Sequence, residues 1–192
     1  LKMVKCYVLN AINRLKVMDF SQRKKDFMLK KIPQSEWHQS MRGYFAGCLF
    51  NAMIDDPDIF LIVGDLGYGV FDKIRDNFPN RFYNVGASEQ AGAGICVGLA
   101  LENRKPFFYS ITTFGLYRPF ETWRNYVNHE KIPVRLVGSG RDKDYHIDGY
   151  SHHSMDAKDI LKTSFPNIII YWPETKEEIP ELVERIVKED KP

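Results

Sequence analysis

Short hydrophobic runs alternate with helical patterns along most of this 192-residue chain. The runs are as long as strands, and the first, Ile59–Val63, is apolar at every position, which is typical of a strand buried on both faces of a parallel sheet. They lie at Ile59–Val63, Phe82–Val85, Phe107–Ile111, Val134–Val137 and Ile168–Trp172. Strands that alternate with helices indicate right-handed βαβ units. We therefore predict an α/β fold of three layers, αβα, with a mostly parallel sheet.

One segment with helical spacing of apolar residues precedes the first run, and another follows each of the last four. We expect helices at residues 36–53, 88–101, 114–129, 156–163 and 176–188. Ligands bind such sheets at the carboxyl ends of the strands. That rule directs attention to Gly64-Asp65, to Gly86–Glu89, to Ile111–Phe114 and to the segment from Gly138 onward.

Composition excludes several classes of protein. The chain is 44% hydrophobic and 27% charged, which is ordinary for a globular protein and unlike collagen, mucins or disordered chains. No apolar run approaches the ~20 residues that span a bilayer, so no membrane anchor is expected. Its three cysteines are far apart and form no C-x-x-C pair, so neither a disulfide framework nor a zinc knuckle is indicated. A reducing, cytoplasmic location fits best.

Charge is distributed unevenly along the chain. Residues 1–31 hold nine Lys or Arg and two Asp, a local charge of +7 that leaves −5 for the rest of a chain whose net charge is +2. Such an arm is compatible with nucleic acid, an acidic partner surface or a solvated helix face. Four apolar residues in it follow a helical spacing: Val4, Val8, Ile12 and Leu15. We favour a helix that packs on something, and divide the chain into a basic, partly helical extension at 1–36 and one domain at 37–192.

The glycine-rich run at Gly92–Gly98 superficially suggests a phosphate loop. Its spacing is one residue longer than the dinucleotide fingerprint, and its glycines lie inside a predicted helix instead of at a strand-to-helix turn. We interpret these small residues as a means for the helix to approach a neighbour closely. No P-loop sequence occurs in the chain.

Two further features lie at strand ends. Glu89 begins a helix, where a carboxylate is often only favourable with the helix dipole, yet its apolar setting also suits a partly desolvated functional group. Aromatic residues recur at Phe114, Tyr117 and Phe120. This stripe is either core or a slot for a flat heterocycle.

The loop Asp144–His153 holds three His and two Asp. A metal site, an unbound polar loop and a substrate-binding loop all remain open. The ligand spacing is irregular for structural zinc, so we predict no metal site. Because long polar loops beyond strand ends meet substrates in parallel sheets, we favour substrate binding.

Taken together, these motifs resemble the pyrimidine-binding domain of transketolase and of its relative deoxyxylulose phosphate synthase. The resemblance rests on Gly64-Asp65-Leu66, Asn84–Gln90, Thr113-Phe114 and Asp148-Gly149-x-Ser151-His152, and covers residues 37–192. Beta subunits of pyruvate dehydrogenase share the glutamate without the Asp-Gly-x-(Ser/Thr)-His pattern. The transketolase side is therefore favoured.

The resemblance implies a thiamine diphosphate cofactor. Glu89 matches the glutamate that hydrogen-bonds the aminopyrimidine ring nitrogen and so promotes removal of the thiazolium C2 proton. Asp65 matches a residue near the cofactor and the subunit contact. Three aromatic residues match the pyrimidine pocket: Phe114, Tyr117 and Phe120. The last stands where a tyrosine is usual, so that hydroxyl is missing.

The resemblance also implies a substrate site. Asp148 and His152 match the pair that contacts substrate hydroxyls and carbonyl, and His152 is expected to act with Glu89 in catalysis. Arg42 has the spacing of an arginine that binds the sugar phosphate.

One part of the family pattern is missing. Family enzymes bind the diphosphate and Mg²⁺ on another domain with a Gly-Asp-Gly motif, which does not occur here. We therefore expect a subunit or fragment of a transketolase-type transferase that transfers a two-carbon ketol unit between sugar phosphates. It would be active only with a diphosphate-binding partner in a homo- or hetero-oligomer, and would bind neither nucleic acid nor membrane. The alternatives are a deoxyxylulose phosphate synthase-like subunit and a non-catalytic regulatory or structural subunit.

Overall fold

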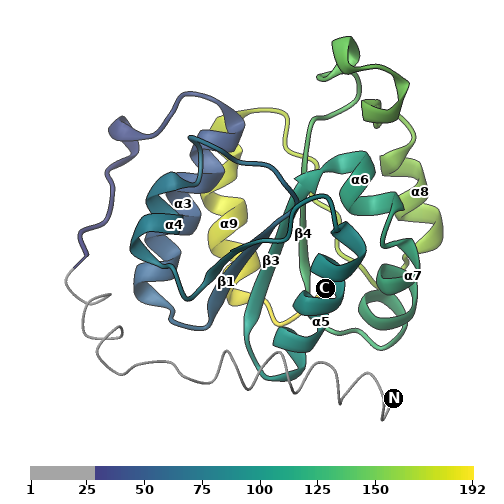
Figure 1. The fold of residues 1–192 in the computed structure, drawn as a ribbon, viewed down its shortest axis with the longest axis horizontal. Helices are drawn as coiled ribbons and strands as arrows, with labels where there is room; N and C mark the ends of the chain where they lie inside the picture. The colour runs from purple at the N-terminus through teal and green to yellow at the C-terminus, as the bar shows by residue number, and fades with distance from the viewer. Residues whose placement is uncertain (1–28) are drawn as a thin grey trace.

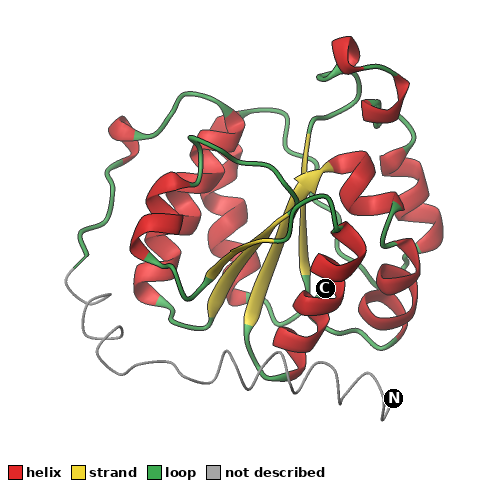
Figure 2. Ribbon diagram, viewed as in Figure 1, coloured by secondary structure: helices red, strands yellow, loops and turns green. Residues whose placement is uncertain are grey.

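The computed structural model describes residues 29–192 as one parallel sheet covered by helices on both faces (Figure 1). Its four strands lie in the order β2-β1-β3-β4. They are β1 (Ile59–Val63), β2 (Phe82–Asn84), β3 (Lys105–Ile111) and β4 (Arg135–Ser139). Every neighbouring pair is parallel. The predicted three-layer α/β fold is therefore confirmed (Figure 2).

Helices occupy nearly all of the expected positions. The α-helices are α3 (Met41–Asp55), α4 (Asp72–Asn77), α5 (Glu89–Leu101), α6 (Thr112–Tyr117), α7 (Phe120–Thr122), α8 (Ala157–Ser164) and α9 (Ile179–Lys188). A π-helical segment, η2 (Trp123–His129), continues α7. The 3-10 turns are η1 (Gln34–Glu36), η3 (His146–Asp148), η4 (Tyr150–His152) and η5 (Lys176–Glu178). The pattern did not predict α4, and the helix expected at 114–129 is divided near Pro119, which lacks a donor for a continuous helix.

Two hydrophobic clusters hold the layers together. On one face of the sheet, α3, α4 and α9 cover a cluster built around Phe45, Met53 and Phe107. On the other face, α5 to α8 and η2 cover a cluster that includes Phe108 and Trp123. Figure 1 shows these groups on opposite sides of the strands. Consecutive buried residues in β1 therefore serve both clusters, as expected for a central parallel strand.

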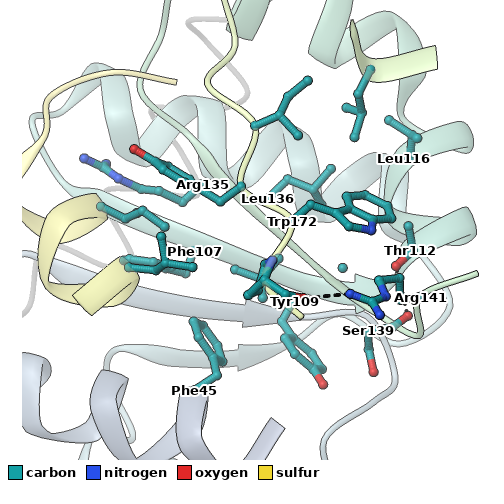
Figure 3. Close-up of a pocket in the computed structure, with 18 of the residues that line it drawn as sticks. Phe45, Phe107, Tyr109, Thr112, Leu116, Arg135, Leu136, Ser139, Arg141 and Trp172 are labelled. Atoms are coloured by element: carbon teal, nitrogen blue, oxygen red, sulfur yellow. Dashed lines mark hydrogen bonds between the residues drawn. The ribbon is translucent and has the colours of Figure 1, made fainter. Parts of the chain in front are cut away.

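The prediction of a fifth strand at Ile168–Trp172 is wrong. This segment forms no ladder with β4, and the Ile169 amide donates instead to the carbonyl of Pro192, at 3.0 Å. A cavity of about 610 Å³ lies between β4 and this segment, and its lining includes Phe45, Leu136 and Trp172 (Figure 3). The apolar pattern correctly indicates a segment close to the sheet. It does not determine which backbone group accepts the hydrogen bond.

The N-terminal extension lies mostly outside the described residues. Its helical stripe, within 1–28, is not described, and the boundary at residue 36 stays a prediction. The described part is held to α3, because the Ile32 amide donates to Asn51 Oδ1 at 2.8 Å and Lys31 pairs with Asp55 at 2.6 Å. Within 29–192, no helix is both long and apolar enough to cross a membrane.

Candidate functional site

Glu89 is the buried carboxylate of the site. It begins α5 just beyond the carboxyl end of β2, and its side chain is only 2% exposed. The first turn of a helix leaves backbone N–H groups unpaired and therefore favours an anion there. A carboxylate with this little exposure still requires a direct donor, because the loss of hydration is costly.

Arg118 is that donor. Its Nη1 atom lies 2.6 Å from Oε2 of Glu89. Its guanidinium carbon lies 3.9 Å from the centre of the Phe114 ring. Sequence reasoning did not single out this arginine, although the signal was present: Arg118 stands four residues after Phe114 in a helical pattern, so both face the same side.

Phe114 meets the loop that follows β4. The His152 ring lies 4.9 Å from the Phe114 ring, at an interplanar angle of 65°. A hydrogen bond of 2.8 Å from Thr113 Oγ1 to the carbonyl of Ser151 holds this part of the loop to α6. Glu89, Phe114 and His152, which come from three connections in the chain, therefore lie together at one edge of the sheet.

Arg42 approaches the same loop from α3. Its Nη1 atom lies 3.5 Å from the hydroxyl oxygen of Tyr145, which is also 2.7 Å from Ser139 Oγ. The Tyr145 and His152 rings are 6.4 Å apart. Arg42 is exposed and lines the cavity beside β4, so it lies next to the loop without contacting Glu89.

Asp65 lies two residues after the end of β1. Its backbone adopts a positive φ of 48°, and its carboxylate accepts a hydrogen bond of 3.1 Å from Tyr68. The Asp65 amide donates to Asn84 Oδ1 at 3.2 Å, which ties the end of β1 to the end of β2. The residue is exposed at the predicted edge.

The other two aromatic residues of the stripe face α8 and the segment that follows it. The Tyr117 hydroxyl donates to Asp156 Oδ1 at 2.7 Å, and burial together with that carboxylate raises the Tyr117 pKa above its ordinary value. The Phe120 ring lies 4.9 Å from Phe165. Phe114 thus has the position of a stacking surface, whereas Tyr117 and Phe120 have structural partners, and their expected place in a pyrimidine pocket stays a prediction.

The remaining loop residues form no metal centre in the described part of the chain. Asp148 is exposed at the end of η3. Among residues 29–192, no group of three or more His, Cys, Asp or Glu is placed to hold a metal ion. Cys48 is not suited to nucleophilic chemistry, because burial raises its pKa to about 12.

Gly92 confirms the interpretation of the glycine-rich run as a close approach. A Cβ atom at this position would lie 2.6 Å from Phe108 Cε2, so only glycine lets α5 rest on β3 at this distance. At Gly94, two residues later, a Cβ atom would meet no other atom within 4 Å. The run therefore serves helix packing at the first of these two positions.

Comparison with known families gives a match over most of the chain. Residues 38–192 match the family described as transketolase, pyrimidine binding domain. An uncharacterized 33.6 kDa protein of the fasciation locus of Rhodococcoides fascians is 26% identical over 151 residues, covering 79% of this chain and 48% of that protein. A 1-deoxy-D-xylulose-5-phosphate synthase of Listeria innocua is 33% identical over 113 residues, covering 59% and 17%. The chain thus spans less than half of either relative.

Solved structures show the same fold. A split gene transketolase, described as an inactive beta4 tetramer, superposes with a TM-score of 0.69 at 23% identity, covering 79% of this chain and 49% of that chain. The transketolase of Leishmania mexicana superposes with a TM-score of 0.70 at 16% identity, covering 97% and 29%.

Proposed function

This chain belongs to the family of transketolase pyrimidine-binding domains, and we propose that it supplies the pyrimidine-binding half of a thiamine diphosphate-dependent active site. Transketolases and deoxyxylulose phosphate synthases use this cofactor. The observation that carries the proposal is that a buried carboxylate, Glu89, and an aromatic face, Phe114, both contact the same planar group, the Arg118 guanidinium, at the carboxyl edge of a parallel sheet.

The side chains around Glu89 fit a flat, nitrogen-rich ring. The Arg118 guanidinium is planar, donates an N–H to Glu89 and lies over Phe114. An aminopyrimidine whose ring nitrogen is protonated has the same two properties, since it is planar and donates an N–H. The Arg118 guanidinium therefore makes the two contacts that an aminopyrimidine ring would make. This supports a site at Glu89 and Phe114 that accepts such a ring.

The chemistry divides between cofactor and protein. Thiamine diphosphate, when bound, supplies a nucleophilic carbon that takes up and releases a two-carbon ketol unit. Glu89 would hold a proton at the pyrimidine ring nitrogen, and Phe114 would fix the ring plane. A low-exposure carboxylate suits this task, because hydrogen bonds strengthen when water is excluded.

Substrate contacts would come from the loop after β4 and from α3. His152, beside Phe114, has an imidazole side chain that can donate or accept a hydrogen bond to a substrate carbonyl or hydroxyl. Asp148, on the exposed part of the loop, would bind substrate hydroxyls. Arg42 would bind an anionic substrate group such as a phosphate, a task for which guanidinium groups are well suited. Asp65 would lie near the cofactor and the partner.

We expect a partner to complete this site. The diphosphate and Mg²⁺ would be bound mainly by a diphosphate-binding subunit or domain, since the Gly-Asp-Gly motif that binds them in family enzymes does not occur in this sequence. The split gene transketolase with the same fold supports an arrangement in which the two halves are separate chains. The chain by itself is then expected to have no turnover.

Reconstitution tests this function. The chain is mixed with candidate diphosphate-binding subunits, thiamine diphosphate and Mg²⁺, and ketol transfer from ketose phosphates is measured for the wild type and Glu89→Gln. Glu102→Gln, an exposed carboxylate at the other end of α5, is the matched control. We expect activity that Glu89→Gln abolishes and Glu102→Gln retains. Full activity of Glu89→Gln would refute the assignment.

A deoxyxylulose phosphate synthase-type reaction is the second candidate. The match of 33% identity to the Listeria innocua synthase favours it. The donor distinguishes the two reactions, since this synthase type uses pyruvate and transketolase uses a ketose. Offering each donor separately to the reconstituted complex decides between them.

A further inference from the structure

The contacts of Arg118 make it more than a counter-ion to Glu89. Its side chain is 45% exposed, whereas that of Glu89 is 2% exposed, so the arginine reaches inward from the rim of the site to a buried partner. It arises at the end of α6, as the residue that caps the helix after Tyr117. A long side chain anchored at a rim can exchange its inner position for solvent without any movement of the sheet.

The inner position coincides with the proposed place of the pyrimidine. Glu89 Oε2 accepts from Arg118 at 2.6 Å, and the Phe114 ring lies under the same guanidinium at 3.9 Å. A pyrimidine that hydrogen-bonds Glu89 and stacks on this face of Phe114 needs both contacts. Two planar groups cannot occupy one position, so binding of the ring requires Arg118 to leave.

We propose that Arg118 is a gating residue that competes with the aminopyrimidine ring for Glu89 and Phe114. The proposal rests on the proposed function, because it assumes that this slot receives a pyrimidine. The exchange replaces one N–H donor with another, so Glu89 is not left buried and unpaired. Removing one partner of a buried ion pair is otherwise strongly unfavourable.

The competition lowers affinity for the cofactor. A ligand that binds only the open arrangement has its affinity reduced by the fraction of molecules in that arrangement. The Arg118 side chain is 45% exposed, so water competes for its guanidinium, and its contacts with Glu89 and Phe114 together oppose pyrimidine binding only modestly. Removing the guanidinium should therefore strengthen pyrimidine binding by roughly three- to tenfold.

Once displaced by the pyrimidine, the Arg118 side chain would lie in a second position. It would extend from the end of α6 toward solvent at the entrance of the site, close to the loop that carries His152. A cation there would favour entry of an anionic substrate after the cofactor is seated. This order of events makes the arginine a link between cofactor binding and substrate approach.

The test uses the full chain and a pyrimidine fragment of thiamine, 4-amino-5-hydroxymethyl-2-methylpyrimidine. Binding is followed by ligand-detected NMR titration for the wild type and for Arg118→Ala. The matched control is Arg124→Ala, an exposed arginine of η2 that contacts Asn125. We expect Arg118→Ala to bind roughly three- to tenfold more tightly than the wild type, and Arg124→Ala to bind like the wild type.

A second variant keeps the test valid if Arg118→Ala fails to fold, because the alanine variant leaves Glu89 without this donor. Arg118→Lys keeps the positive charge and loses the planar guanidinium, and it is measured beside the alanine variant. We expect intermediate affinity for the lysine variant. Thermal melting of each variant, with and without the pyrimidine, gives a readout independent of activity. The pyrimidine should raise the melting temperature of both variants more than that of the wild type.

The possible results distinguish failure of the gating proposal from failure of the proposed pyrimidine-binding function. Equal affinity of the wild type and the two Arg118 variants overturns the gate and leaves the pyrimidine site standing. Weaker binding by both variants also overturns it, since Arg118 would then be a ligand of the ring. Absence of binding in every variant overturns the gate together with the proposed function.

Discussion

The His152 ring lies 4.9 Å from the Phe114 ring, although one residue belongs to the loop after β4 and the other to the helix after β3. The parallel pairing of these two strands brings both connections to the same edge. A side chain able to move protons thus stands beside the aromatic surface proposed for the cofactor. Substrate and cofactor chemistry would meet at this contact.

Replacement of Phe114 tests the stacking surface. Phe114→Leu keeps an apolar side chain and removes the aromatic face. We expect the affinity of the reconstituted complex for thiamine diphosphate to fall about 2- to 10-fold, the equivalent of about 0.5–1.5 kcal/mol for an aromatic pair. Equilibrium titration of the cofactor measures this. Unchanged affinity would exclude Phe114 from the cofactor contact.

Phe120→Leu is the matched variant on the same stripe. Because the Phe120 ring packs on Phe165, we expect this change to lower stability while cofactor affinity stays near the wild-type value. Urea unfolding and the same cofactor titration give the two quantities. If both variants weaken cofactor binding equally, the pocket uses Phe120 as the family resemblance implies.

Two glycines of α5 provide a matched test of helix packing. Gly92→Ala would place a Cβ 2.6 Å from Phe108 Cε2, so we expect it to lower the free energy of unfolding by about 1–3 kcal/mol. At Gly94 a Cβ would have no neighbour within 4 Å, so alanine should raise the free energy of unfolding by up to about 1 kcal/mol through helix propensity. Denaturant titration of the two variants measures the difference. Equal effects would contradict the close approach of α5 to β3.

Ionisation of Tyr109 is expected to lower the free energy of unfolding at alkaline pH. Burial raises its pKa to about 12, whereas an unfolded tyrosine has a pKa of about 10. Because the folded pKa is the higher one, this contribution is fully present below pH 10 and is lost as the pH rises toward 12. The loss amounts to at most about 2.7 kcal/mol.

Tyr109→Phe should remove that dependence. Urea unfolding at pH 7, pH 10 and pH 11.5 is compared for the wild type, Tyr109→Phe and Tyr68→Phe, the last being an exposed control. We expect the wild type and Tyr68→Phe to lose more stability above pH 10 than Tyr109→Phe. Parallel curves for all three proteins would show that Tyr109 does not carry the effect.

The sequence predicts the fold well where burial alone determines the structure. Ile59–Val63 is apolar throughout, and Phe107–Ile111 is interrupted only by Ser110, so both segments favour the centre of a covered parallel sheet. The segment at Ile168–Trp172 has a similar pattern without forming a strand. Its hydrogen-bond partner is the carbonyl of Pro192, a choice between backbone groups that carries no signal in side-chain hydrophobicity.

The part of the site that can be predicted from the sequence consists of the residues that follow the strands. Glu89, Phe114 and His152 all follow strands, and parallel pairing brings strand ends together. The sequence did not predict Arg118, because its role depends on the direction of a long side chain, which reaches from the end of α6 across to α5. The spacing to Phe114 places the two on one face, but only the three-dimensional structure brings the guanidinium to Glu89.

The most direct test of the central proposal is the exchange of the thiazolium C2 proton of thiamine diphosphate with deuterium, because it needs no knowledge of the substrates. The exchange rate is measured in the complex with a diphosphate-binding partner for the wild type, Glu89→Gln and the control Glu102→Gln. If Glu89 activates the cofactor, the rate in Glu89→Gln falls roughly 10²- to 10⁴-fold, while Glu102→Gln exchanges like the wild type. Equal rates in all three proteins would contradict the assignment of Glu89, and with it the proposed role of this chain.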